Sequence, residues 1–354
     1  MTEPVFVIST GRSGSTALSN CINSHPNLLS LSEFFLFIHF HTDFQEDESH
    51  WPGLSLERWD GQQFWDFISK KSPTHMHRYF DKGIMPKELL YKVTPTSRFN
   101  METGIPGISM TPLPHLTDHP DELYEELESV VTQYPKDRLD RQYRRLFDYL
   151  LKRFGRDVCV ERSGMSVYFV DRLINMFPNA KFIFLYRDLR ENVMAFNRFQ
   201  GFKMGMAIKE ANKKTGVNPA DPDTDPEQLG EYQWLHPDYF DVEKLNQFEI
   251  PYETFGAKLS QAMVSASEEL DKLPSHQVLN LRYETLVDAP KDQLRRVIDF
   301  IQPESATKAT NEQWIEQAAA TIRSKPNTWK DLPDEKRQRL EEACEPALKL
   351  LEYV

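Results

Sequence analysis

The sequence predicts an α/β protein in which a P-loop-like parallel sheet is flanked by helices on both faces. Two observations lead to this prediction. Short apolar runs of strand type alternate with stretches of helical periodicity along the 354 residues, and such alternation is typical of parallel sheets covered by helices. In addition, a turn rich in glycine and serine, residues 11–16 (GRSGST), joins the first expected strand directly to the first expected helix.

The first half of the chain contains three expected strands. Residues 5–9 form an apolar run that predicts a buried strand, and residues 16–24 predict the helix after it. Residues 28–32 predict a second strand. Residues 138–154 have helical spacing with a basic outer face, and residues 158–161 (VCVE) predict the strand behind that helix.

The second half repeats the pattern. Residues 166–177 predict a helix, and residues 181–186 (KFIFLY) predict a buried strand of high β-propensity. Residues 191–199 predict another helix. Residues 278–283 (VLNLRY) and 291–301 again give a strand followed by a helix. We therefore expect one domain, residues 1–354, with insertions between its core elements.

Two long stretches interrupt the alternation. Residues 36–135 are rich in Phe, Trp, His, Met and Pro, and residues 200–255 contain the acidic segment ADPDTDPEQ, residues 220–228. Long excursions from an α/β core commonly build the substrate side or a lid. We expect residues 36–135 to form the substrate side, with plain surface padding as the alternative, and residues 200–255 to form a lid or loop. The aromatic side chains of the first stretch suit a pocket or a core equally well.

The composition excludes several classes of partner. The formal net charge is −12 without a basic stripe, so a nucleic acid is not expected to bind. There is no apolar run of membrane-spanning length and no signal sequence. Three scattered cysteines indicate neither a disulfide framework nor a zinc site, and the histidine pairs lack converging Asp or Cys residues. We expect a cytoplasmic protein without a membrane span and without a bound metal.

The turn at residues 11–16 has the features of a phosphate-binding loop. Its glycines allow backbone N–H groups to point toward one place, and the helix that follows adds its partial positive charge. The turn is too short for the G-x-x-x-x-G-K-[ST] motif and lacks the lysine of that motif. This weakens, without removing, the hypothesis of a P-loop kinase or NTPase.

A second motif, Tyr186-Arg187-Asp188, ends the strand over residues 181–186. The carboxyl ends of parallel strands share one edge of a sheet, so Arg187 is expected at the same edge as the glycine-rich turn. Its guanidinium is always charged and suits a phosphate. The alternatives are an ion pair of Arg187 with Asp188 or a helix carboxylate, and a magnesium-binding role for Asp188.

In these motifs the chain resembles the PAPS-dependent sulfotransferase superfamily, where PAPS is 3'-phosphoadenosine-5'-phosphosulfate. The 5'-phosphosulfate loop of that family matches GRSGST, and its 3'-phosphate segment matches YRDLRENVMAF at residues 186–196. Residues 281–290 (LRYETLVDAP) and 323–333 (RSKPNTWKDLP) also match, in the same order. The loop is similar to Arg-Ser-Gly members such as the tyrosylprotein branch, in which a His-Pro pair and a catalytic Glu follow. Here His25-Pro26 and Glu33 fall at the corresponding offsets.

The resemblance implies catalytic roles for three residues. Glu33 would be the general base that takes the proton of the acceptor hydroxyl. Arg12 would neutralise the charge that develops at the bridging oxygen and the sulfuryl group, and Arg162 would be a second cation near that group. The alternatives for Glu33 are a solvated loop carboxylate and an ion pair with Arg12. The alternative for Arg162 is a surface ion pair.

The resemblance also implies a set of cofactor-binding residues. The 5'-phosphate would be held by the loop residues Gly11, Arg12, Ser13, Gly14, Ser15 and Thr16. Arg187, Arg323 and Lys325 would bind the 3'-phosphate, the group that separates PAPS from ATP. Many family members have a Ser at the position of Ala195. One hydroxyl contact to the 3'-phosphate is therefore expected to be missing, or to be supplied by Asn192 or Ser324.

The resemblance therefore predicts a sulfotransferase with insertions in its fold, which moves a sulfuryl group from PAPS to the hydroxyl of a small-molecule alcohol or phenol and releases adenosine 3',5'-bisphosphate. The tyrosylprotein branch is usually membrane-anchored, and no anchor is evident here, so a protein-tyrosine acceptor does not follow. The alternatives are a P-loop kinase-like or NTPase-like phosphotransferase and a non-catalytic nucleotide-binding protein.

Overall fold

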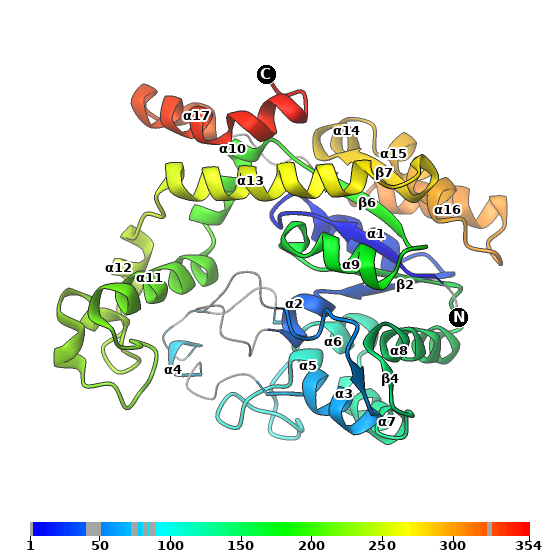
Figure 1. Ribbon diagram of the computed structural model, residues 1–354, viewed down its shortest axis with the longest axis horizontal. Coiled ribbons are helices and arrows are strands. Elements are labelled where there is room, and N and C mark those ends of the chain that lie inside the picture. Colours follow the sequence, from blue (N-terminus) through cyan, green and yellow to red (C-terminus); the bar gives the residue numbers. More distant parts are fainter. Residues whose placement is uncertain are drawn as a thin grey trace.

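A five-stranded parallel sheet lies at the centre of the computed structural model, which describes residues 3–39, 51–71, 77–80, 82, 84, 89–323 and 328–354 (Figure 1). The strand order is β2-β5-β1-β6-β7, and every neighbouring pair in this sheet is parallel. The strands are β1 (Val5–Ile8), β2 (Leu28–Ser32), β5 (Val158–Arg162), β6 (Lys181–Tyr186) and β7 (Val278–Arg282). This order places β1 in the middle of the sheet. The loop that follows β1 therefore lies at the centre of the edge formed by the carboxyl ends of the strands.

Helices cover both faces of the sheet, and alternate side chains of the strands therefore enter two separate hydrophobic cores. Phe6 and Phe182 belong to one core, whereas Val5 and Ile183 belong to the other. The first core contains residues of α8 (Leu139–Phe154), α9 (Val170–Met176), α10 (Leu189–Asn197), α13 (Tyr252–Asp271) and α17 (Asp334–Leu350). The second contains residues of α1 (Ser15–Asn23), α14 (Tyr283–Asp288), α15 (Pro290–Ile301) and α16 (Lys308–Ala319). The predicted fold class is confirmed.

The described part of residues 36–135 packs against the first core. Its elements are α2 (Phe34–Ile38), β3 (Arg58–Trp59), α3 (Gly61–Ile68), α4 (His77–Phe80), α5 (Gly107–Met110), α6 (Pro112–Leu116) and α7 (Pro120–Val131). β3 pairs with β4 (Asp137–Arg138) in a two-stranded antiparallel sheet. The ring of Tyr143 in α8 contacts those of Phe34, Phe35 and Phe64. These aromatic side chains are therefore core, which settles one of the alternatives left open by the sequence.

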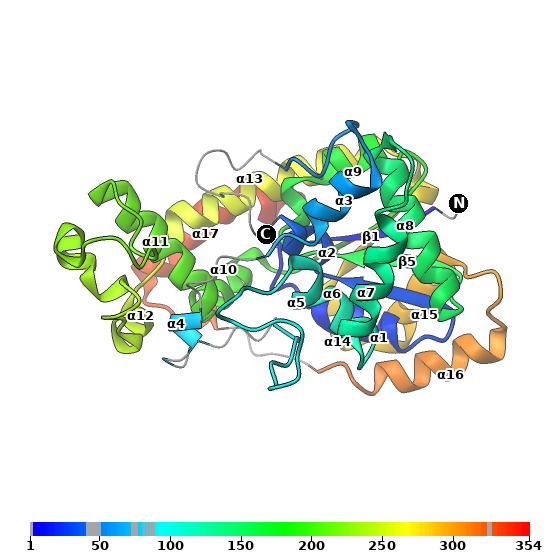
Figure 2. The same cartoon turned by 90° about the horizontal axis from the view of Figure 1, so that it is seen from below.

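Residues 200–255 form mostly helical structure. α11 (Gln200–Thr215), η3 (Pro226–Leu235) and α12 (Val242–Gln247) share a small third core with Tyr79 and Ile84. The Tyr79 hydroxyl donates to the carbonyl of Leu235 at 2.8 Å, and Arg78 pairs with Asp238 at 3.2 Å. The two insertions thus meet away from the sheet, with α4 beside α11 and α12 in both views (Figures 1 and 2). A lid role for this body, and the acceptor-side role of the first insertion, stay predictions.

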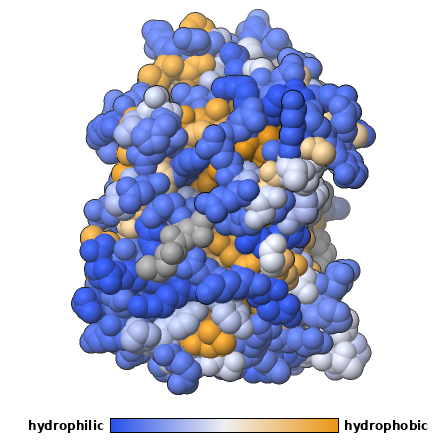
Figure 3. Space-filling model, turned by 90° about the vertical axis from the view of Figure 1, so that its right-hand side faces the viewer, coloured by the Kyte–Doolittle hydropathy of each residue, from blue (hydrophilic) through white to orange (hydrophobic). Residues whose placement is uncertain are grey.

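The remaining short elements are η2 (Ser166–Tyr168), η4 (Ser275–Gln277) and η5 (Trp329–Asp331). η2 and α9 replace the single helix expected over residues 166–177, because Phe169 leaves the helical conformation between them. The face of the molecule in Figure 3 is largely hydrophilic, with apolar atoms gathered in small areas between polar ones. No helix in the described part of the chain is long and apolar enough to cross a membrane.

Candidate active site

The carboxyl ends of the five parallel strands meet at one edge of the sheet, and most of the polar residues singled out in the sequence follow these ends. Residues 9–14 come after β1, Glu33 comes after β2, Arg162 ends β5, Arg187 follows β6 and Tyr283 follows β7. The edge therefore brings together residues that lie far apart in the sequence, as the strand-end argument predicted.

The loop after β1 leads directly into the N-terminus of α1 and contains three residues with positive φ. Gly11 and Gly14 have φ of 76° and 89°, and Arg12, a residue with a side chain, has φ of 57°. A Cβ on Gly14 would lie 2.4 Å from the ring of Tyr283, so this position has room only for glycine. Gly14 is also the N-cap of α1 and provides no side-chain cap. The first N–H groups of α1 thus form the type of helix terminus that binds anions.

Polar groups in and around the loop fix its shape. Asn192 on α10 donates through Nδ2 to the carbonyl of Gly11 at 2.9 Å and to Oγ1 of Thr10 at 2.5 Å. Ser13 Oγ is buried and has no hydrogen-bond partner among the described residues. Buried hydroxyls normally have partners. The loop therefore has a free hydroxyl, a candidate ligand for an anion, and Asn192 contacts the loop itself.

Arg187 lies next to this loop and is only 4% exposed. Its guanidinium lies 4.6 Å from the centre of the Tyr283 ring, and Nη1 donates to the carbonyl of Arg12 at 3.4 Å. The nearest carboxylate, Glu191, is 3.9 Å from Nη2. Nε and Nη2 have no hydrogen-bond partner among the described residues. Arg187 is therefore a buried cation with unused donors at the ligand edge.

Asp188 has a different role from both alternatives that the sequence left open. Its carboxylate pairs with Arg190 at 2.9 Å and accepts the backbone N–H of Arg190 at 3.0 Å, which caps α10. It does not pair with Arg187. Because the carboxylate is already occupied by these contacts, a magnesium-binding role for Asp188 is disfavoured.

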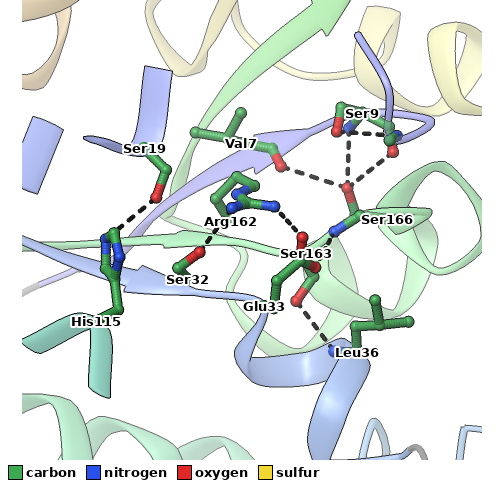
Figure 4. A network of polar contacts seen from close by, with 12 residues as sticks. Val7, Ser9, Ser19, Ser32, Glu33, Leu36, His115, Arg162, Ser163 and Ser166 are labelled. Atoms are coloured by element: carbon green, nitrogen blue, oxygen red, sulfur yellow. Dashed lines mark hydrogen bonds and ion pairs between the residues drawn. The ribbon is translucent and has the colours of Figure 1, made fainter. Parts of the chain in front are cut away.

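Glu33 and Arg162 form a buried ion pair, with side chains 8% and 3% exposed (Figure 4). Arg162 Nη1 donates to Glu33 Oε1, and Nη2 donates to Ser32 Oγ at 2.6 Å. The backbone N–H of Gly164 donates to the other carboxylate oxygen of Glu33 at 2.7 Å. The predicted base and the predicted second cation are thus in direct contact. An ion pair with Arg12 was the alternative role weighed for Glu33. The ion pair in the structure is with Arg162 instead, because β5 lies directly beside β2.

Arg12 points in another direction. Its guanidinium lies 5.0 Å from the centre of the Phe199 ring, at the junction of α10 and α11. Arg12 thus lies on the side of the loop that faces the second insertion.

Of the two cations predicted from the C-terminal motif, Arg323 and Lys325, the structure describes only Arg323, and its side chain does not point to the loop after β1. Arg323 Nη1 donates to the carbonyls of Ala320 and Ile322, so the side chain turns back onto the end of α16. A basic side chain is stabilised at a helix C-terminus by the orphan carbonyls there. Ser324 and Lys325 lie outside the described residues.

Two residues at the site, Tyr283 and Glu191, were given no role from the sequence. The ring of Tyr283 packs close to both Gly14 and the guanidinium of Arg187. Glu191 is buried and accepts hydrogen bonds from the backbone N–H groups of Thr328, at 2.6 Å, and Trp329, which attaches η5 to α10. The spacing of four residues between Arg187 and Glu191 is the one feature of the sequence that could have indicated their contact.

Glu161 and His115 have pKa values that burial shifts strongly. Burial raises the pKa of Glu161 to about 8, and burial together with Arg162 lowers the pKa of His115 to about 4. Both side chains are therefore neutral at pH 7. His115 Nε2 lies 3.5 Å from Ser19 Oγ (Figure 4). Among the described residues no cluster of three or more His, Cys, Asp or Glu side chains is arranged to hold a metal ion.

No protein of curated function matches the sequence. Among solved structures, the sulfotransferase domain from the curacin biosynthetic pathway is 17% identical, with 98% of each chain covered and a TM-score of 0.40. A sulfotransferase from Mycobacterium avium is 13% identical, with 99% of this chain and 76% of that chain covered and a TM-score of 0.41. A sulfotransferase from Alicyclobacillus acidocaldarius is 10% identical, with 99% and 100% covered and a TM-score of 0.37.

The family model decides the classification. The model of the sulfotransferase family matches residues 4–259, which include the loop after β1, Glu33, Arg162 and Arg187. This match extends over more than half of the 354 residues. The chain belongs to the sulfotransferase family.

Proposed function

We propose that this sulfotransferase takes the sulfuryl group from PAPS and transfers it to the hydroxyl of a small-molecule alcohol or phenol, with Glu33 as the general base. The observation that carries the choice of donor is Arg187. Arg187 is 4% exposed and has a long ion pair with Glu191, the helix carboxylate that was the alternative partner, but its Nε and Nη2 donors remain without hydrogen-bond partners among the described residues. Buried donors of this kind are costly to leave unpaired, so a second anion is favoured there. A 3'-phosphate beside the 5'-phosphate loop provides that anion, and ATP has none at this position.

The residues of the loop suit the 5' end of the same nucleotide. The N–H groups at the start of α1 and the hydroxyls of Ser13 and Thr16 would bind the 5'-phosphate. Arg12 and Arg162 would be the cations near the sulfuryl group. PAPS, when bound, supplies a sulfuryl group whose bond to the 5'-phosphate oxygen breaks as the acceptor oxygen bonds to sulfur.

Glu33 is suited to take the proton that the acceptor hydroxyl loses. Each carboxylate oxygen has two lone pairs, so the contacts to Arg162 and to the N–H of Gly164 leave acceptor capacity on Glu33. Because Arg162 compensates the carboxylate charge, the base is held in a buried place without an isolated charge. The non-helical backbone of Glu33, with φ of 56°, turns its side chain toward β5.

The acceptor and the location are also part of the proposal. A small-molecule acceptor is proposed because the sequence offers no feature that selects a macromolecule. The three cysteines are free and buried, which suits a reducing compartment such as the cytoplasm.

The test uses labelled PAPS, a panel of alcohols and phenols, and the variant Glu33→Gln. The variant keeps the shape of the side chain and removes its basicity, so we expect turnover to fall about 10²- to 10⁴-fold with unchanged affinity for adenosine 3',5'-bisphosphate. Glu102→Gln, at an exposed position in the first insertion, is the matched control and should keep wild-type turnover. Wild-type turnover in Glu33→Gln would remove Glu33 from the proposed mechanism.

A further inference from the structure

A second carboxyl group, Glu161, lies next to Arg162 of the Glu33–Arg162 ion pair in the sequence. It is the fourth residue of β5 and is 1% exposed. It precedes Arg162, and neighbouring residues of a strand point to opposite faces. Glu161 therefore faces the core that contains Phe35, whereas Arg162 pairs with Glu33. The mechanism proposed above gives this buried acid no task.

The contacts of Glu161 are directed at the start of α2. Its Oε1 accepts a hydrogen bond from Ser163 Oγ at 2.5 Å and another from the backbone N–H of Phe35 at 3.3 Å. Ser163 Oγ in turn accepts the backbone N–H of Leu36 at 3.1 Å (Figure 4). Glu161 and Ser163 thus satisfy two of the N–H groups that the first turn of a helix leaves unpaired.

These contacts replace a cap that Glu33 does not provide. Glu33 is the N-cap residue of α2, but its side chain makes no capping hydrogen bond because it is directed to Arg162 and Gly164. Its left-handed backbone, with φ of 56°, is strained for a residue with a side chain. Such a conformation persists only when neighbouring contacts hold it. One contact is the N–H of Glu33 on the carbonyl of Arg162, at 2.5 Å.

We propose that Glu161 is a positioning residue for Glu33: together with Ser163 it fixes the first turn of α2, so that the Glu33 carboxylate stays at the transfer site. The inference rests on the proposed role of Glu33 as the base. It assigns a use to a buried carboxyl group that neither the cofactor loop nor the ion pair requires.

The charge state of Glu161 fits this role. Burial, with a smaller contribution from Glu33, raises the pKa of Glu161, against the hydrogen bonds of Ser163 and Phe35 and the charge of Arg162. The Cys159 thiol on the same strand is also kept neutral by burial, which raises its pKa. A protonated Glu161 therefore adds no negative charge beside the Glu33–Arg162 ion pair. Ionisation of Glu161 would add a second negative charge beside the base and weaken this arrangement.

The variants Glu161→Gln and Glu161→Ala test the proposal through the pH dependence of turnover. We expect wild-type kcat to decline above about pH 8. Glu161→Gln keeps an uncharged acceptor for Ser163 and Phe35, so it should have near wild-type kcat at pH 7 and lose this decline. Glu161→Ala removes the acceptor, and kcat should fall about 10- to 100-fold, as expected for misplacement of a catalytic group. Affinity for adenosine 3',5'-bisphosphate should stay within about twofold in both variants, because the cofactor loop is untouched.

Several results would overturn the proposal. An unchanged alkaline decline in Glu161→Gln, or wild-type kcat in Glu161→Ala, would contradict it. If Glu161→Ala does not bind the bisphosphate and is therefore misfolded, Ser163→Ala gives the same test with a smaller change. Wild-type kcat in Ser163→Ala would equally refute the inference. Failure of the general-base proposal is recognised separately, by wild-type turnover in Glu33→Gln.

Discussion

Replacement of Arg162 by Met should destabilise the fold strongly, because it leaves the Glu33 carboxylate buried without a cation. Met keeps most of the side-chain volume, so the change isolates the charge. Breaking a buried ion pair typically costs about 3–5 kcal/mol. The N–H of Gly164 still contacts the carboxylate at 2.7 Å, so we expect about 3 kcal/mol, the lower end of that range.

A double-mutant cycle makes this prediction specific to the pair. Glu33→Gln alone should cost about 1–3 kcal/mol, since it leaves Arg162 with an uncharged partner. In the double variant neither charge remains, so its free energy of unfolding should exceed the additive value by about 1 kcal/mol or more. Urea denaturation gives the four free energies. Arg141→Met, at an exposed position with an ion pair of 3.8 Å, is the control and should change stability by less than about 0.5 kcal/mol. Strict additivity of the two substitutions would refute the coupling.

Three further predictions follow from single contacts. Gly14→Ala should destabilise the protein by about 1–3 kcal/mol more than Gly216→Ala in thermal melts, because both glycines have positive φ but only the first would place a Cβ against Tyr283; equal effects would contradict this. Arg187→Ala should weaken binding of adenosine 3',5'-bisphosphate about 10- to 100-fold, as loss of a charge-assisted contact does, and should leave 5'-AMP affinity unchanged in calorimetry; equal losses for both nucleotides would move the 3'-phosphate elsewhere. The folded state keeps the Glu161 proton up to about pH 8, whereas the unfolded chain releases it near 4.5. Between these values the free energy of unfolding of the wild type should therefore fall, relative to that of Glu161→Gln, by about 1.4 kcal/mol per pH unit. Urea denaturation at several pH values measures this difference, and a difference that does not change with pH would contradict the burial argument.

The sheet was predictable from the sequence because its strands are short runs of buried, β-prone residues. All five strands lie within about one residue of their expected ends. The insertions were not predictable in the same way. Their cores depend on contacts over long sequence distances, such as that between Tyr79 and Leu235, and local periodicity contains no signal for these contacts.

The site was predictable to the extent that the strand-end rule applies. It placed the loop after β1, Glu33 and Arg187 at one edge, as the structure has them. The rule does not say which side chains pair across that edge, so the contact of Glu33 with Arg162 was missed. The rule also gives no role to Glu161. In the sequence this residue is an ordinary strand residue, and only its contact with the start of α2 in the structure indicates a function.

The use of PAPS is the central claim, and calorimetric titration of the wild-type protein tests it most directly. Adenosine 3',5'-bisphosphate, 5'-AMP and ATP are each titrated with and without magnesium. The bisphosphate should bind at least about 10-fold more tightly than 5'-AMP, without magnesium, because Arg187 contributes a charge-assisted contact to the 3'-phosphate alone. Equal affinity for the bisphosphate and 5'-AMP, or tight binding of ATP that requires magnesium, would contradict the claim.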